Sequence, residues 1–573
     1  MKSRGLSRSW CFFLAFTPLP PSFILQSLNI GDAMVKRWAI GMLIVLTLAL
    51  GANAADWKTE RQPRYIIFIM GDGLGVDELE LARQYSLAVL GHDLFITETL
   101  AREGYCALMD TYSTNNLVTD SAAGASAWAT GQKIKNGQVS VDPVSGDPLQ
   151  TILEYYKEKH DFQTGLVSND NITGASPAAF AAHAARWDTK EIARQYCDET
   201  HPDVILGGGR REFLAKNRYD DRDLVQDFVA RQGYRYVTTA DELARVRSGK
   251  VLGLFADDVL TWQIDRPPEG ALEPMTSEMT EAALRILSAD RPNGFFLFVE
   301  ECLPDKAGHK SDAAATVCGI LELDRTVATA YRFYRKHPQE TLLIVTADHE
   351  TGGLQWLMGY PWLDKVRAAE RREGEKDPVA RLASVHASIA KTVAGLQEKL
   401  TPEEQARLRW RYRQFRFDAN VAEALEKGRG TLGKLGEKWE TVLTHLVARN
   451  TGAYYTTGQH NLAAVPLFAI GVGAERFSGH LDNAETGRIL FRLAGRQDFR
   501  IVRTTKPARG SGVSTTYDYS TSYDTNETEY DYTSQSSAQY GQETYPEYSN
   551  YTKTRSRQKR NAKQSKSTEA TDE

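Results

Sequence analysis

One hydroxyl group is a clear candidate nucleophile. Ser121 lies in the sequence VTDSAAGA, residues 118–125, between the carboxylate of Asp120 and a run of small residues that leaves space above its oxygen. A serine hydroxyl is a weak nucleophile near neutral pH, and it needs a base or a metal ion to lower its pKa. No Gly-x-Ser-x-Gly pattern surrounds Ser121, so the nucleophile elbow of a hydrolase triad is not indicated. We therefore expect metal ligands elsewhere in the chain to activate it.

The candidate metal ligands are carboxylates, imidazoles and one further hydroxyl, most of them beside short apolar runs. They are Asp72, Ser176, Glu300, Asp305, His309, Asp348, His349 and His460. Mixed carboxylate and imidazole ligation suits zinc, whereas ligation by oxygen alone suits magnesium. The residue types therefore indicate a metal-assisted reaction of the Ser121 hydroxyl.

Apolar runs without alternation predict how these residues come together. The runs are residues 66–70, 295–299, 342–347 and 465–470. Such runs are typical of strands that are buried on both faces of a parallel sheet. Ligands of an open parallel sheet bind beyond the carboxyl ends of its strands. Because Asp72, Glu300 and Asp348 with its neighbour His349 fall at such ends, we expect distant residues to converge on one site.

Helical stretches alternate with the apolar runs between residues 107 and 353, for example at 149–159 and 277–287. This alternation predicts an α/β fold with a doubly wound, mostly parallel central sheet flanked by helices. From residue 356 to about 450 the chain becomes charged and helical, which predicts a helical insertion. Within it, Thr401 and Pro402 are typical of a helix N-cap and first turn.

The motifs GDGLG, TDSAAGA, TADHETGG and TGQH, in this order, resemble those of alkaline phosphatases, which are metal-dependent phosphomonoesterases. The resemblance runs from about Tyr65 to about Gly473. It implies an alkaline-phosphatase-like fold and the hydrolysis of phosphate monoesters through a phosphoserine intermediate, at a site with two zinc ions (Zn2+) and one magnesium ion (Mg2+). A phosphodiesterase of the same superfamily, or a non-catalytic surface protein that binds phosphate, remains an alternative.

The resemblance implies a role for each candidate residue. Ser121 matches the nucleophile. The ligands of the first zinc match Asp305, His309 and His460, and those of the second zinc match Asp72, Asp348 and His349. Asp72 would also bridge to magnesium, together with Glu300 and Ser176.

Three further positions bear on substrate and metal binding. The phosphate-clamping arginine of the family most nearly matches Arg186, although the register there is one residue short of some relatives. A diesterase would tend to lack this clamp. Gly174 stands where many relatives place an aspartate or a histidine near the third metal, which leaves the identity of that metal open. Lys306 follows Asp305, where family members vary between histidine and lysine, and a lysine there could contact phosphate.

Several of these residues also have ordinary structural explanations. Asp120 or Ser121 could cap a helix, which is compatible with catalysis because a helix N-terminus favours an anion. Asp348 and His349 could form a surface turn, and Glu300 could belong to a solvated charge pair. The motifs taken together weigh against these explanations.

The two ends of the chain differ in composition from its middle. Two positive charges after Met34, an apolar run and the sequence Ala52-Asn53-Ala54 predict a leader and signal peptide in residues 1–54, with translation starting at Met34. We therefore expect a periplasmic or secreted protein with a catalytic domain at 55–503. Residues 504–573 are rich in Ser, Thr and Tyr and end in basic residues, which predicts a disordered tail that could contact an envelope or an acidic polymer.

Charge, the helical insertion and cysteine content bear on binding partners and on disulfide bonds. The formal net charge of −5 argues against a general nucleic-acid binder. Insertions in relatives cap the active site or contact a second subunit, so the protein could form a homodimer.

The four cysteines beyond the leader allow three disulfide pairings, among which the sequence does not choose. Cys302 lies near Glu300 in the sequence, but the family uses no cysteine ligand there.

Overall fold

A computed structural model describes residues 62–267, 272–289, 293–356 and 378–496 of the chain. All of these residues belong to the unit that begins at Arg61. The leader and signal peptide predicted at 1–54 and the tail predicted at 504–573 lie outside the described residues.

The described residues contain a ten-stranded sheet with the order β14-β2-β13-β10-β1-β9-β4-β6-β8-β7. All neighbouring strands are parallel except at β13, which runs antiparallel to β10 and to β2. The predicted α/β fold with a mostly parallel central sheet is thereby confirmed. The strands are β1 (Tyr65–Gly71), β2 (Tyr105–Asp110), β4 (Gln163–Asn171), β6 (Val204–Gly208), β7 (Arg235–Val237), β8 (Val251–Leu254), β9 (Phe295–Glu301), β10 (Thr341–Thr346), β13 (Val465–Gly471) and β14 (Gly479–Asp482).

The middle of the sheet is covered on both faces. Every residue of β1, β9 and β10 is buried, as their unbroken apolar runs predict. Phe68 of β1 pairs in register with Phe298 of β9, and Phe180 of helix α7 (Ala175–Ala181) stacks on Phe298 with ring centroids 4.4 Å apart. Because the registers are fixed in this way, the carboxyl ends of these strands stop at the same edge.

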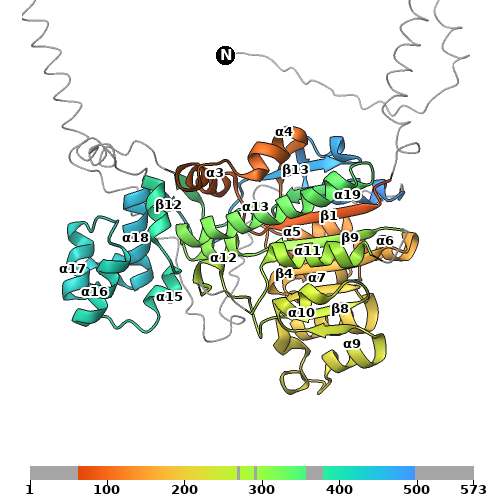
Figure 1. Cartoon of the computed structure of the whole chain (residues 1–573), viewed down its shortest axis with the longest axis horizontal. Coiled ribbons are helices and arrows are strands. Elements are labelled where there is room, and N and C mark those ends of the chain that lie inside the picture. The colour runs from red at the N-terminus through yellow and green to blue at the C-terminus, as the bar shows by residue number, and fades with distance from the viewer. Residues whose placement is uncertain (1–61, 268–271, 290–292, 357–377, 497–573) are drawn as a thin grey trace, which may run out of the picture. The chain divides into compact units, whose positions relative to one another are not determined.

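Helices flank the sheet in two groups. In Figure 1, α11 and α13 cross in front of the strands; α11 contacts β4 and β9, and α13 contacts β1 and β10. The second group consists of α5, α6, α7 and α19, which contact one another. The helices predicted at 149–159 and 277–287 are confirmed as α6 and α11. The bounds are α5 (Ser121–Thr130), α6 (Ile152–His160), α11 (Thr276–Leu287), α13 (Ala313–Lys336) and α19 (Asn483–Leu493).

A helical segment extends from the ribbon formed by β11 (Leu354–Trp356) and β12 (Ala453–Tyr455), which pair antiparallel. Thr401 caps its helix α16 and forms a capping box with Glu404, so the predicted helix start is confirmed. Apolar residues of this segment share one core with residues of α12 (Leu303–His309) and α13. Its elements are η7 (Pro378–Ser384), α15 (Ile389–Val393), α16 (Pro402–Arg411), α17 (Ala419–Lys427), η8 (Arg429–Gly436) and α18 (Trp439–Thr451), of which the α-helices lie together in Figure 1.

The remaining elements are shorter or more peripheral. They are α3 (Val76–Tyr85), η1 (Ser86–Leu90), η2 (Ile96–Leu100), α4 (Ala101–Glu103), β3 (Gln138–Val139), β5 (Ala184–Ala185), α8 (Thr189–Gln195), η3 (Tyr196–Thr200), η4 (Arg210–Phe213), η5 (Ala215–Asn217), α9 (Leu224–Gln232), α10 (Ala240–Arg245), η6 (Gln263–Asp265) and η9 (Ala474–Arg476).

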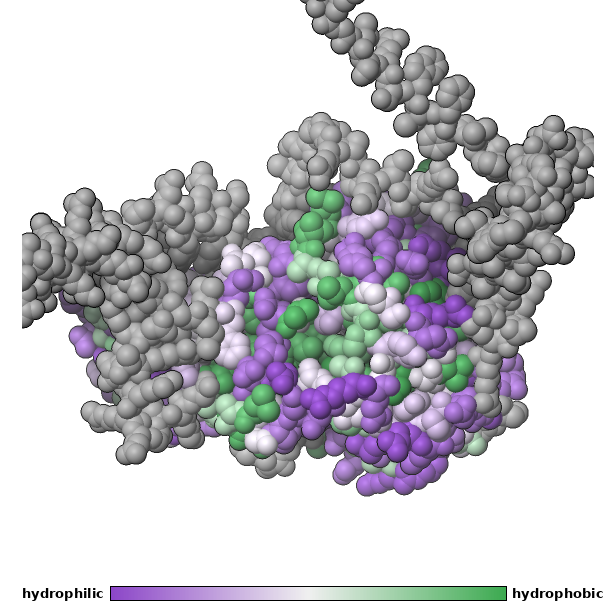
Figure 2. Space-filling view, turned by 90° about the horizontal axis from the view of Figure 1, so that it is seen from above, coloured by the Kyte–Doolittle hydropathy of each residue, from purple (hydrophilic) through white to green (hydrophobic). Residues whose placement is uncertain are grey.

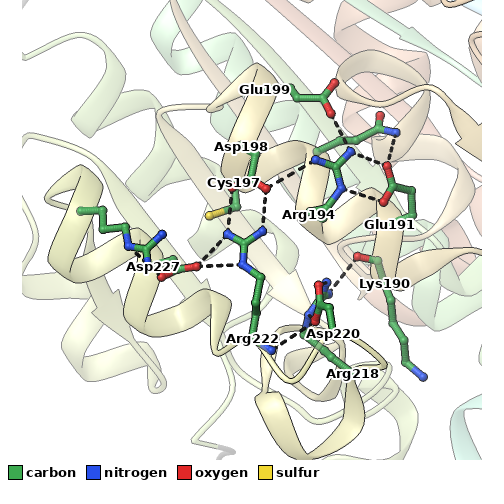
Figure 3. Close-up of polar contacts among 12 residues, drawn as sticks. Lys190, Glu191, Arg194, Cys197, Asp198, Glu199, Arg218, Asp220, Arg222 and Asp227 are labelled. Carbon is green, nitrogen blue, oxygen red and sulfur yellow. Dashed lines mark hydrogen bonds and ion pairs between the residues drawn. The ribbon is translucent and has the colours of Figure 1, made fainter.

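A network of ion pairs joins α8, η3 and α9 (Figure 3). Arg222 lies 2.7 Å from carboxylate oxygens of both Asp198 and Asp227, and Arg194 lies 2.5 Å from Glu191. Single exposed ion pairs contribute about 0–1 kcal/mol each to folding stability. A side chain that already forms one ion pair in a network loses less conformational freedom when it forms another. The network therefore serves to hold α9 against η3.

The surface mixes apolar and polar residues. Apolar residues (green) gather at the centre of the face shown in Figure 2, among polar residues (purple). Exposed apolar side chains such as Leu87 and Leu108 are common on folded proteins and do not by themselves mark a partner. Among the described helices, none is both long and apolar enough to cross a membrane. All cysteines within the described residues have free thiols.

Candidate active site

The predicted ligands meet at the carboxyl edge of the central sheet. Asp72 follows β1, Glu300 lies at the end of β9, and Asp348 comes two residues after β10. Strand β1 pairs in register with both β9 and β10, so these three positions are neighbours. His460 precedes β13, and because β13 is antiparallel its amino end lies at the same edge.

Gly73 allows the chain after β1 to pass close to α12. Its φ is +71°, in the left-handed region that favours glycine. A β-carbon at this position would lie 2.6 Å from the α-carbon of Asp305 and 2.8 Å from Thr351 Oγ1. The glycine after Asp72 is therefore required by the close packing of the segments that carry the ligands.

Asp305, His309 and His460 form the first ligand group. Nδ1 of His309 lies 2.7 Å from the Gly458 carbonyl oxygen, and Nδ1 of His460 lies 2.9 Å from that of Thr119. These contacts place a proton on each Nδ1 and leave both Nε2 atoms with lone pairs. The two Nε2 atoms are 3.2 Å apart. Lone pairs that face each other at this distance repel, so the geometry fits a cation held between them.

Asp305 supplies the negative charge of this group. Its Oδ1 lies 3.2 Å from His309 Nε2 and 3.4 Å from His460 Nε2. Burial opposes ionisation of Asp305, but when His309 and His460 carry protons on Nε2 their charge outweighs burial and holds the pKa of Asp305 well below the usual range; a cation bound to the same Nε2 atoms would take the place of those protons. An ionised carboxylate and two Nε2 atoms are a donor set that suits zinc.

Asp72, Asp348 and His349 form the second ligand group, and all three side chains are buried. His349 Nε2 lies 3.1 Å from Asp348 Oδ2 and 3.7 Å from Asp72 Oδ1. Neither of these carboxylate oxygens has a hydrogen-bond partner among the described residues. Burial, reinforced by neighbouring carboxylates, raises the pKa of Asp72 well above its usual value. Buried oxygens without donors require a proton or a cation, and a divalent ion suits these nitrogen and oxygen donors.

Thr351 connects the two ligand groups. Its hydroxyl donates to Asp305 Oδ1 at 2.6 Å and lies 3.1 Å from His349 Nδ1. Since the hydroxyl proton is directed at Asp305, the hydroxyl oxygen accepts from His349 Nδ1–H, which leaves His349 Nε2 free to bind a metal. The rings of His349 and His460 also stack, with centroids 3.4 Å apart. The two groups are therefore parts of one continuous site.

Ser121 begins helix α5 beside the second ligand group. Asp120 caps the helix by accepting from the Ala123 N–H at 2.9 Å, so Ser121 has no capping role. Ser121 Oγ lies 3.2 Å from His349 Nε2. A β-carbon on Gly124 would lie 3.0 Å from that of Asp348, so the small residues after Ser121 let the helix come close. The hydroxyl and the helix N-terminus thus face the ligands together.

Arg186 reaches the start of the same helix. Its Nη1 donates to Asp120 Oδ2 at 2.9 Å, and the Gly137 N–H donates to the same oxygen at 2.8 Å. Asp120 thus binds the start of the helix through Oδ1 and binds Arg186 through Oδ2. The Arg186 side chain is 28% exposed, so part of it is in contact with solvent.

Glu300 anchors a third group, in which the donors are oxygens. The Ser168 hydroxyl donates to Glu300 Oε2, and Ser176 is near enough to this carboxylate to help lower its pKa. Burial, reinforced by the charge of Asp170, raises the pKa of Glu300 to about 8. Oxygen ligation of this kind suits magnesium.

Lys306 and Cys302 belong to neither of the two mixed ligand groups. Lys306 Nζ contacts Asp170 Oδ2 at 3.0 Å, so its charge is already paired. Cys302 is buried. The sequence did not single out Asp170 or Thr351; the only available signal was that Thr351 lies within the TADHETGG motif.

Known proteins resemble this chain in sequence and in fold. The family model described as alkaline phosphatase matches residues 63–496. Alkaline phosphatase 3 of Bacillus subtilis (strain 168) is 31% identical over 457 residues, which cover 77% of this chain and 91% of that protein. The repressible alkaline phosphatase of Saccharomyces cerevisiae is 35% identical over 374 residues, covering 59% of this chain and 65% of that protein. The crystal structure of Thermus thermophilus alkaline phosphatase superposes with a TM-score of 0.65 at 28% identity, covering 76% of this chain and 92% of that chain.

Proposed function

The chain belongs to the alkaline phosphatase family and is a phosphatase that acts on phosphate monoesters, and we propose that it works through a phosphoserine intermediate on Ser121. The observation that carries this proposal is the 3.2 Å distance between Ser121 Oγ and His349 Nε2. A protein that only bound phosphate, without catalysis, would not need a hydroxyl group placed among metal ligands.

We assign the two mixed nitrogen and oxygen groups to zinc and the oxygen group around Glu300 to magnesium. The orphaned oxygens of Asp72 and Asp348 and the facing Nε2 atoms of His309 and His460 fit this assignment. When bound, the metal ions would supply positive charge that lowers the pKa of the Ser121 hydroxyl and stabilises the departing ester oxygen.

In the first half of the proposed reaction, Ser121 Oγ attacks phosphorus. A bond forms between Oγ and phosphorus as the hydroxyl proton passes to solvent, the bond from phosphorus to the ester oxygen breaks, and the ester oxygen takes a proton from water and leaves as the alcohol. The N-terminus of α5 favours negative charge at this position. Arg186 presents a planar fork of donors that can bind two phosphoryl oxygens at once, and Asp120 holds it beside the nucleophile.

In the second half, water attacks the phosphoserine, the bond between phosphorus and Ser121 Oγ breaks, one proton of the water restores the Ser121 hydroxyl, and inorganic phosphate leaves. The histidines keep one tautomer throughout, because Gly458 O, Thr119 O and Thr351 Oγ1 each hold an Nδ1–H. Their Nε2 lone pairs therefore stay directed at the site during both halves of the cycle.

A phosphodiesterase is the second candidate, and the position of Arg186 is the argument against it. A phosphate monoester has three non-bridging oxygens, so it can engage both the positive site and a bidentate arginine, whereas a diester has two. Because Arg186 contacts the carboxylate next to Ser121, the geometry favours a monoester.

The test compares p-nitrophenyl phosphate with its bis-ester in the presence of zinc and magnesium. We expect turnover of the monoester to exceed that of the bis-ester, and Ser121→Ala to lose turnover of both. Ser126→Ala in the same helix is the matched control and should keep turnover. Peptide mass spectrometry after acid quenching should find a phosphoryl group on Ser121. A preference for the bis-ester, or full activity of Ser121→Ala, would contradict the proposal.

We also propose that the protein is exported through its N-terminal signal. The two positive charges, the apolar run and the small residues at 52–54 support this proposal. We expect the N-terminus of the protein from the periplasm or the medium to be Ala55. Protein that stays in the cytosol and begins at Met34 would contradict export.

A further inference from the structure

The oxygen group around Glu300 lacks an acidic side chain at position 174, where the neighbouring backbone leaves no room for a β-carbon. Gly174 has φ −61° and ψ 167°, a conformation open to any residue. A β-carbon there would meet the Asn171 carbonyl oxygen at 2.8 Å and Asp170 Oδ2 at 3.9 Å. Position 174 therefore holds no side chain as the backbone stands, and the carboxylate of Asp170 lies beside it.

We propose that Asp170 is a positioning residue for the third metal site and provides the negative charge that position 174 lacks. This inference rests on the proposed function, in which a magnesium ion binds near Glu300. Asp170 would not bind the ion directly; its negative charge would neutralise the ammonium group of Lys306.

The end of β4 is irregular where it carries Asp170. The pairing of β4 with β6 shifts register between Val167 and Asn171, within the segment that contains Asp170. A break in regular strand pairing changes the direction in which side chains point at the end of a strand. Asp170 N–H donates to Ser168 Oγ at 2.9 Å, and the Ser168 hydroxyl in turn donates to Glu300. One hydroxyl thus fixes Asp170 and Glu300 relative to each other.

The two oxygens of Asp170 have separate partners. Oδ1 accepts from the Asn171 N–H at 2.7 Å, which fixes the rotamer of the side chain. Oδ2 lies 3.0 Å from Lys306 Nζ. Lys306 lies on α12 with the ligand Asp305, so an unpaired ammonium here would stand close to the metal groups and compete with a divalent cation. Asp170 cancels this charge and leaves the charge of Glu300 available for the metal.

The test measures magnesium binding to the zinc-loaded protein as the rise in melting temperature with magnesium concentration. Asp170→Asn keeps the shape of the side chain and removes its charge. We expect the magnesium concentration for half-maximal stabilisation to rise by ~10–100-fold, the usual cost of losing an outer partner of a metal site. Zinc content, measured by elemental mass spectrometry, should not change. Asp257→Asn, an exposed carboxylate also paired with a basic side chain, is the matched control and should bind magnesium as the wild type does.

A second variant separates the charge of Lys306 from a general loss of structure. Asp170→Asn combined with Lys306→Gln removes the unpaired cation, and we expect it to recover most of the magnesium affinity. Unchanged magnesium affinity in Asp170→Asn would overturn the inference, and so would a double variant that binds magnesium no better than Asp170→Asn. Because the readout does not depend on turnover, it remains valid if Ser121 proves not to be the nucleophile.

Discussion

Replacement of Thr351 by valine isolates the contact between the two zinc groups. Valine has nearly the same shape, so the change removes one hydroxyl that is buried and bonded on both sides. The bond to the Asp305 carboxylate is worth about 1.5–3 kcal/mol, and an unsatisfied His349 Nδ1–H costs about 1–3 kcal/mol more. His349 also loses the acceptor that fixes its tautomer. We expect the affinity for the second zinc to fall ~10–100-fold, as is typical when a partner of a ligating histidine is removed.

The assay is zinc retention during dialysis against a competing chelator, followed by kcat/KM for p-nitrophenyl phosphate with excess zinc. Thr351→Ser retains the hydroxyl and should hold zinc within a few-fold of the wild type. If Thr351→Val retains zinc as the wild type does, the hydroxyl does not position His349 and the argument for a continuous site is wrong.

Three further changes test other parts of the structure. Arg186→Lys keeps the charge but loses the planar fork, so kcat/KM should fall roughly tenfold to a hundredfold, the equivalent of one charge-assisted hydrogen bond; unchanged steady-state kinetics would exclude Arg186 from phosphate binding. Burial raises the pKa of Asp312 to about 6 from its ordinary 3.8. The protonated carboxyl therefore contributes up to ~3 kcal/mol to the free energy of unfolding at pH values below 3.8, and this contribution is lost as the pH rises through 6. Chemical unfolding of Asp312→Asn between pH 4 and 7 should show its stability increasing relative to the wild type by that amount, and a difference that does not change with pH would contradict the shift. Trp439→Ala should lower the free energy of unfolding by about 3–5 kcal/mol, because its buried ring and its bond to the Gln397 carbonyl are lost, while zinc content should stay constant; loss of zinc would link the core of the helical segment to the metal site.

The sequence predicted the centre of the fold because burial on both faces leaves an unbroken apolar run. Strands β1, β9 and β10 are of this kind, and the polar residues at their carboxyl ends, such as Asp72 and Asp348, could therefore be assigned to one edge. The direction of β13 could not be read in this way, since an apolar run looks the same in a parallel and an antiparallel strand. His460 reaches the edge only because β13 is antiparallel.

The contacts that orient the ligands were harder to predict. Thr351 is adjacent in the chain to neither His349 nor Asp305, and its role depends on rotamers that spacing does not determine. Asp170 was not identified because the family resemblance points to position 174, whereas the irregular end of β4 places Asp170 beside Lys306. In both cases the sequence contains the residue, but the local backbone decides what the residue contacts.

The most direct test of the central claim is anomalous diffraction at the zinc edge from crystals of the metal-loaded protein. We predict two zinc peaks about 3.5–4 Å apart, one among Asp305, His309 and His460 and the other among Asp72, Asp348 and His349, with Ser121 Oγ beside the second. A single peak, or peaks outside these two groups, would contradict the account.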